Sequence, residues 1–141
     1  MRKLASIQII DKIERIPDAD RIVLANIKGW KCVVPITAFQ EGDKCVYFEV
    51  DAFLPVEERF EFLRSSSYKN NEFMGQGFRI KTQTLRGQIS QGLALGLSAF
   101  PEIDPSIEVD TDVTELLNVR KWDMPEILGN AGTAIGDKPF G

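Results

Sequence analysis

Three positively charged side chains fall within eight positions of one short segment, GFRIKTQTLRGQISQGL (77–93). Arg79, Lys81 and Arg86 have no carboxylate among them, although the 141-residue chain carries 17 Lys and Arg against 21 Asp and Glu. Cations beside glycines, which let another backbone approach closely, suit contacts to phosphate groups. Because side chains alternate along a strand, Arg79 and Lys81 are expected to emerge on one polar face. The segment therefore predicts a phosphate-contacting surface in a mildly acidic protein.

Charge is segregated along the rest of the chain as well. Residues 64–91 hold five cations and one anion, whereas residues 98–119 hold six anions and no cation. Such segregation creates a local field that the net charge conceals. The alternative is a solvated strand face, in which the cations serve solubility. The candidate nucleic-acid contacts are Arg64, Tyr68, Lys69, Arg79, Lys81, Arg86 and Gln88.

Catalytic and metal-binding chemistry finds little support in the composition. The chain has no histidine, which excludes His ligands, His general bases and Ser-His or Cys-His nucleophile pairs. Cys32 and Cys45 lie in apolar runs, and two thiolates do not complete a zinc site, so both are predicted to be buried structural thiols. No catalytic residue and no cofactor or metal site is predicted within this chain.

Short strand-like runs separated by turns dominate the sequence. Turns are predicted at residues 17–20, 28–29, 41–43 and 86–87, a short helix at 57–63, a surface loop at 65–77 and a second helix from Asp112. Five or six strands with short helices favour a mainly β protein, a small OB-fold-type β-barrel. A β-sandwich is the rival, but it usually needs seven or more strands.

Several strings resemble, in order, the N-terminal OB module of ATP-dependent, nick-sealing RNA ligases. They are RKLASIQIIDKIERIPDADRI, GWKCVV, VYFEVDAFLP with FEFLRSSSY, GFRIKTQTLRGQISQGLALGL and DVTELLNVRKWDMPEI, and they cover roughly residues 1–128. In that family an OB domain precedes a nucleotidyltransferase domain, whose motif lysine forms a lysyl-AMP adduct. The only string here with similar ends, Lys138 to Gly141, lacks the acidic residue of that motif.

The resemblance implies an OB-fold nucleic-acid-binding domain at 1–119 and a linker at 120–141 toward an absent nucleotidyltransferase domain. The expected function is an accessory module that clamps a nicked duplex with an RNA strand while the catalytic domain joins a 3′-OH to a 5′-phosphate. This fragment alone is expected to be inactive and to bind no cofactor. ATP and a divalent metal, Mg or Mn, are expected in the absent domain.

Two other functions are compatible with the sequence. Residues 16–21, IPDADR, are similar to an early turn of free-standing tRNA-binding OB modules. A protein-interaction domain would instead use the acidic stretch 98–119 as its contact surface. No apolar run approaches the ~20 residues that span a bilayer, so an intracellular protein without a membrane partner is expected. The protein is also expected to be a monomer.

Overall fold

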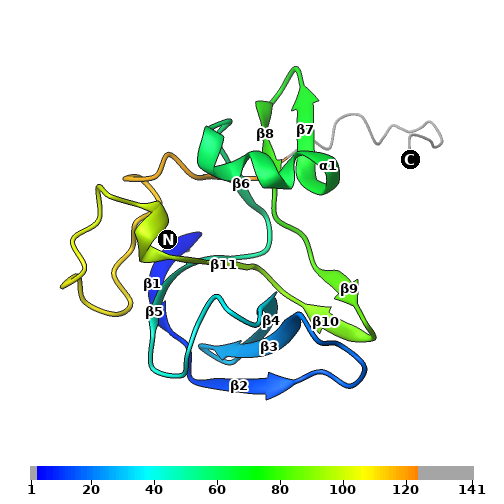
Figure 1. Ribbon diagram of the computed structural model, residues 1–141. Coiled ribbons are helices and arrows are strands. Elements are labelled where there is room, and N and C mark those ends of the chain that lie inside the picture. Colours follow the sequence, from blue (N-terminus) through cyan, green and yellow to red (C-terminus); the bar gives the residue numbers. More distant parts are fainter. Residues whose placement is uncertain (1–2, 124–141) are drawn as a thin grey trace.

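The structure is a computed structural model and describes residues 3–123. It is mainly β, as predicted, with short 3-10 and α-helical segments (Figure 1). The strands of the described residues are β1 Ala5–Ile9, β2 Lys12–Arg15, β3 Ile22–Ile27, β4 Trp30–Pro35, β5 Lys44–Phe48, β6 Ala52–Leu54, β7 Tyr68–Asn71, β8 Gly75–Arg79, β9 Gln83–Leu85, β10 Gln88–Ser90, β11 Leu93–Gly96 and β12 Arg120–Lys121.

β1 and β2 act as one bent strand that passes from one sheet to another. β1 pairs antiparallel with β5, which also pairs with β11, whereas β2 pairs with β3 and β3 with β4. At the bend the Ile10 amide donates to the Asp43 carbonyl and the Asp11 amide to the Asn26 carbonyl, both at 2.8 Å. These bonds keep the buried backbone satisfied while the strand changes partners.

Hydrogen bonds also link β4 to residues 90 and 91, at the end of β10. The Gln91 amide donates to the Lys31 carbonyl at 2.8 Å, and the Val33 amide donates to Ser90 Oγ at 2.9 Å. This seam has too few bonds for a full ladder, as in the partly open, five-stranded barrel of an OB fold. The predicted OB-type fold is therefore confirmed, although bends and breaks divide its strands into more segments than expected.

β5 separates two hydrophobic cores. Cys45 and Tyr47 face the interior of the barrel, where they pack with residues of β3 and β4. Val46 and Phe48 face the opposite way, into a core covered by the 3-10 helix η1 (Glu58–Leu63), the helix α1 (Arg64–Ser67) and the 97–119 segment. Both rows of β5 are buried because both faces of the strand are covered. The helix predicted at 57–63 is present as η1.

A second sheet, in the order β12-β6-β8-β7, stands beside the barrel at the top of Figure 1. The loop predicted at 65–77 is wrong, because residues 68–71 and 75–79 form the antiparallel strands β7 and β8. Residues 120–122 lie against this sheet: β12 pairs with β6, and Trp122 packs on Phe53 with ring centroids 5.2 Å apart. The rest of the expected linker, residues 124–141, lies outside the described residues.

The helix predicted from Asp112 is also wrong. The segment instead runs along the free edge of β1, where the Ile7 amide donates to the Thr111 carbonyl at 3.0 Å and the Val113 amide to the Ala5 carbonyl at 2.9 Å. Asp112 caps a turn, since its Oδ1 accepts from the amide and the hydroxyl of Thr114. This pairing satisfies backbone groups at the edge of β1, which would face solvent if the segment formed a helix instead.

Candidate nucleic-acid interface

Arg64, Tyr68 and Lys69 come from α1 and β7. The Arg64 guanidinium makes two bonds to the Glu61 carboxylate, at 2.7 and 3.0 Å, and lies 4.4 Å from the centre of the Tyr68 ring. The Glu61 carboxylate raises the pKa of Arg64, and Arg64 in turn lowers the pKa of Glu61. The Tyr68 hydroxyl donates to Gln76 at 2.6 Å. Arg64 therefore has a local counter-charge, whereas Lys69 has no ion pair within residues 3–123.

Arg79 is partly buried and is held by contacts within the domain. Its Nη2 donates to Asp51 Oδ1 at 3.0 Å, its guanidinium lies 5.1 Å from the centre of the Trp122 ring, and its buried Nε has no hydrogen-bond acceptor in the described part of the chain. Asp51 also accepts the Trp122 amide at its backbone carbonyl, at 2.8 Å. This arrangement gives Arg79 a part in fixing Trp122, and it disfavours the predicted phosphate contact for this residue.

Lys81, Arg86 and Gln88 lie further along the chain. Lys81 is half-buried on the segment between β8 and β9 and has no ion pair among the described residues. Arg86 and Gly87 form the predicted hairpin turn between β9 and β10, with φ of 50° and 77°. Arg86 donates to the Asp18 carbonyl at 3.3 Å, a neutral partner that leaves its positive charge uncompensated. Gln88 is half-buried at the start of β10.

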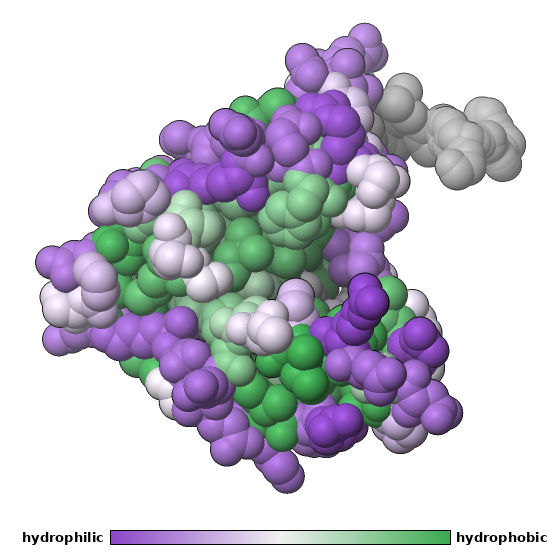
Figure 2. Space-filling view, in the orientation of Figure 1, coloured by the Kyte–Doolittle hydropathy of each residue, from purple (hydrophilic) through white to green (hydrophobic). Residues whose placement is uncertain are grey.

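The candidate cations are spread along the molecule and do not form one cluster. β7, the 80–82 segment and the β9–β10 hairpin follow one another down one side in Figure 1. We call Lys69, Lys81 and Arg86, which these elements carry in that order, the basic row. Figure 2 shows hydrophilic residues around the rim of the visible face and a more hydrophobic centre. Cations carried by successive elements of the fold suit contacts to successive phosphates of an extended backbone.

Two carboxylates of the acidic stretch 98–119, those of Asp110 and Glu102, pair with side chains from other parts of the domain. Asp110 Oδ1 accepts from Gln8 at 3.0 Å, and the Asp110 carboxylate forms ion pairs with Lys3 and Lys28 at 3.3 and 3.4 Å. Glu102 accepts two bonds from Arg59, at 2.7 and 2.9 Å. These contacts use the carboxylates in holding segments together, which disfavours the protein-interaction alternative.

Stability is expected to fall at low pH partly through Asp110. Its bonds to Gln8, Lys3 and Lys28 lower its pKa to about 2, below the ordinary value of ~3.9 in an unfolded chain. A lowered pKa contributes stability above pH ~4 that is lost as pH falls through about 2. Urea unfolding at pH 5 and at pH 2.5 measures the effect. Between these two pH values, Asp110→Asn should lose less free energy of unfolding than the wild type. Asp20→Asn, outside this network, is the control, and equal losses in all three proteins would contradict the assignment.

The two cysteines behave as predicted. Cys32 and Cys45 are buried and unpaired, and burial raises the pKa of Cys45 to about 12. Within residues 3–123, no three His, Cys, Asp or Glu side chains are grouped so that they could hold a metal ion. The same residues contain no helix long and apolar enough to cross a membrane.

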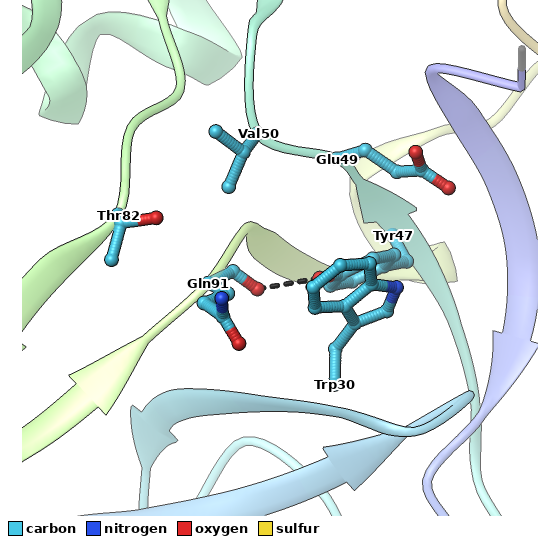
Figure 3. A pocket seen from close by; sticks show the side chains of 6 residues that line it. All are labelled: Trp30, Tyr47, Glu49, Val50, Thr82 and Gln91. Carbon is cyan, nitrogen blue, oxygen red and sulfur yellow. Dashed lines mark hydrogen bonds between the residues drawn. The ribbon is translucent and has the colours of Figure 1, made fainter.

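Sequence reasoning missed a cavity of about 200 Å³ at the mouth of the barrel (Figure 3). Its lining comes from the start of β4, the end of β5 and the two segments that flank the β9–β10 hairpin, and consists of Trp30, Tyr47, Glu49, Val50, Thr82 and Gln91. The available signal was the position of Trp30, which shares an alternating row with the core residues Cys32 and Val34. The other lining residues come from segments that are distant in the sequence, so no local sequence pattern indicates the cavity.

The bent strand β1–β2, shared by two sheets, and the partly open barrel define an OB-fold domain. A family model described as an OB-fold domain matches residues 4–97, and the chain belongs to that family. None of the curated proteins matches the chain.

Among solved structures, the chain is similar to the RNA ligase of Naegleria gruberi. A variant of that ligase with AMP and Mn matches with a TM-score of 0.81 and 40% identity, over 88% of this chain and 36% of the ligase. Another variant with ATP and Mn matches with a TM-score of 0.80 and 40% identity, over 87% and 36%. The resemblance to ATP-dependent RNA ligases is thus confirmed, and this chain spans about a third of their length.

Proposed function

We propose that this domain is the nucleic-acid-binding accessory module of an ATP-dependent RNA ligase. Its task is to hold a nicked duplex with an RNA strand while a nucleotidyltransferase domain joins the 3′-OH to the 5′-phosphate. The observation that carries the proposal is the 40% identity with an RNA ligase over 88% of the chain. An OB fold is also a common scaffold for oligonucleotide binding.

The basic row supplies the physical basis for holding the duplex. Lys69, Lys81 and Arg86 have no carboxylate partner in the described chain, so their charges are available to phosphates. Phosphate contacts fix the register of a duplex without reading its sequence. Holding the two ends in line converts a bimolecular step into a nearly unimolecular one, which accounts for a large part of many rate enhancements.

The chemistry itself belongs to the partner domain in this proposal. That domain provides the lysine that accepts AMP, and it binds ATP and the divalent metal, Mg or Mn. The OB domain contributes orientation and affinity, acts as a monomer and is inactive in ligation by itself.

Nick sealing separates this function from the alternatives. In the ligase that carries this domain, the triple variant Lys69→Ala, Lys81→Ala, Arg86→Ala should seal a nicked RNA duplex about a hundredfold more slowly at subsaturating RNA, since about 1 kcal/mol is lost per contact. Formation of the lysyl-AMP adduct, which needs no RNA, should keep its wild-type rate. Unchanged sealing would show that the row does not hold the duplex. An equal loss in both steps would assign the row to support of the catalytic domain.

A further inference from the structure

The cavity at the mouth of the barrel contains an aromatic ring in an unusual position. Trp30 opens β4 directly after the Lys28–Gly29 turn and pairs with Ile27, which is fully buried in the barrel core. Residues opposite each other in an antiparallel pair point to the same face, so Trp30 belongs to the inward row. It is nevertheless 40% exposed, because the barrel is open beside it. An inward-facing indole is thus left with one side uncovered.

Polar groups surround the space next to this ring. Figure 3 shows Val50 directed into the cavity, with Thr82 and Gln91 on the side across from the Trp30 ring. The Tyr47 hydroxyl is already committed, because it donates to the Gln91 carbonyl. By contrast, the Thr82 hydroxyl and the Gln91 side-chain amide make no hydrogen bond within residues 3–123. The cavity therefore combines a stacking surface with a free hydroxyl and a free amide.

The size and the lining of the cavity suit a small, planar ligand. At about 200 Å³ it is smaller than the ~300–1,000 Å³ of drug-sized sites, and mouths of β-barrels are common places for ligands. One planar ring system fits such a space between an indole and an aliphatic wall. The amide of Gln91 can both donate to and accept from the edge of a heteroaromatic ring, and the Thr82 hydroxyl can do the same.

We propose that this cavity receives one unpaired nucleobase, which stacks on Trp30 and bonds to Gln91 and Thr82 at its edge. The proposal rests on the proposed function, since RNA binding brings the base to the site. Lys81 supports it. Lys81 and Gln83 line a neighbouring cavity while Thr82 lines this one, so a cation lies on the other side of the same segment. A nucleotide whose base enters beside Thr82 can thus place its phosphate toward the basic row.

Two probes test the proposal with the 141-residue chain. One is a short nicked RNA duplex that is fully paired, and the other is the same duplex with a single unpaired 2-aminopurine at the nick. The second duplex should bind about fivefold to a hundredfold more tightly, the range that base–aromatic stacking supplies, with quenching of 2-aminopurine fluorescence. Trp30→Leu should remove both the gain and the quenching but leave binding of the paired duplex unchanged. Trp30→Phe should retain part of the gain in affinity and part of the fluorescence quenching.

Phe62→Leu is the matched control, because Phe62 is an aromatic residue 58% exposed outside this cavity, and it should change neither probe. If the unpaired base brings no gain, or if the gain survives in Trp30→Leu, the cavity is not a base site, although the duplex proposal stands. If only the duplex with the unpaired base binds, the base site stands and the proposed grip on paired duplex fails. Absence of binding to either probe overturns both.

Discussion

Removing the basic row should weaken binding of a nicked RNA duplex by about a hundredfold at low salt, roughly 1 kcal/mol for each of three lost contacts. In the triple variant Lys69→Ala, Lys81→Ala, Arg86→Ala the slope of log K against log salt concentration should also fall by about 2 to 3. Each cation that neutralises a phosphate releases counterions, and the slope counts such contacts. Fluorescence anisotropy of a labelled duplex at several salt concentrations measures both quantities.

A variant with the same change in net charge separates this effect from bulk electrostatics. Lys12→Ala, Lys28→Ala, Lys44→Ala removes three cations away from the basic row; Lys28 pairs with Asp110, and Lys44 donates to the carbonyls of Pro105 and Ile107. Its affinity and salt slope should stay close to those of the wild type. If both triple variants lose affinity equally, binding follows net charge and the row has no special part.

The other large effect is expected from Gly92→Ala, which should lower the free energy of unfolding by about 3–5 kcal/mol. Gly92 has a φ of 93°, and a Cβ there would lie 2.6 Å from Tyr47 Cζ and 2.7 Å from the Phe48 carbonyl oxygen. Tyr47 cannot move aside easily, because it is buried in the barrel core and its hydroxyl donates to Gln91. The substitution therefore combines backbone strain with a clash inside a close-packed core. Urea unfolding followed by circular dichroism measures the loss.

Gly87→Ala is the matched control for this prediction. Gly87 also has a positive φ, 77°, but a Cβ there would meet no atom within 4 Å. Gly87→Ala should lower the free energy of unfolding only through the backbone strain of a side chain at positive φ, by about 1 kcal/mol. Equal losses at the two positions would mean that the close packing of Gly92 on Tyr47 does not contribute to stability.

The parts of the fold that local chemistry determines could be predicted from the sequence. Asp18, Lys28–Gly29 and Arg86–Gly87 all adopt positive φ in the turns expected there. Buried Cys32 and Cys45 followed from alternating apolar runs. In each case the signal lies within a few adjacent residues, where periodicity and turn propensity act.

Segments whose structure depends on distant partners could not be predicted. The polar run from Tyr68 to Gly75 reads as a loop, yet it forms β7 and the start of β8 because β8 pairs with β6. The segment at Asp112 has a helix-start signal, but pairing with β1, more than a hundred positions away, competes successfully. Long-range pairing commonly overrides weak local propensity.

The same limit applies to the candidate site. Arg79 alternates correctly with buried Phe78 and Ile80, so its face could be predicted. Its partners could not, because Asp51 and Trp122 lie 28 and 43 positions away. The sequence predicts which side chains are polar and exposed on a strand, whereas the structure distinguishes the paired Arg64 and Arg79 from Lys69, Lys81 and Arg86.

The most direct test of the account is to map the bound duplex on the domain itself. In NMR spectra of the isotope-labelled chain titrated with a nicked RNA duplex, the largest shift changes should fall on β7, residues 80–82 and the β9–β10 hairpin, and they should include the side chains of Lys69, Lys81 and Arg86. The acidic segment 98–119 should remain nearly unchanged. Shift changes centred on 98–119, or none on the basic row at a saturating duplex concentration, would contradict the central claim that this row holds the RNA backbone.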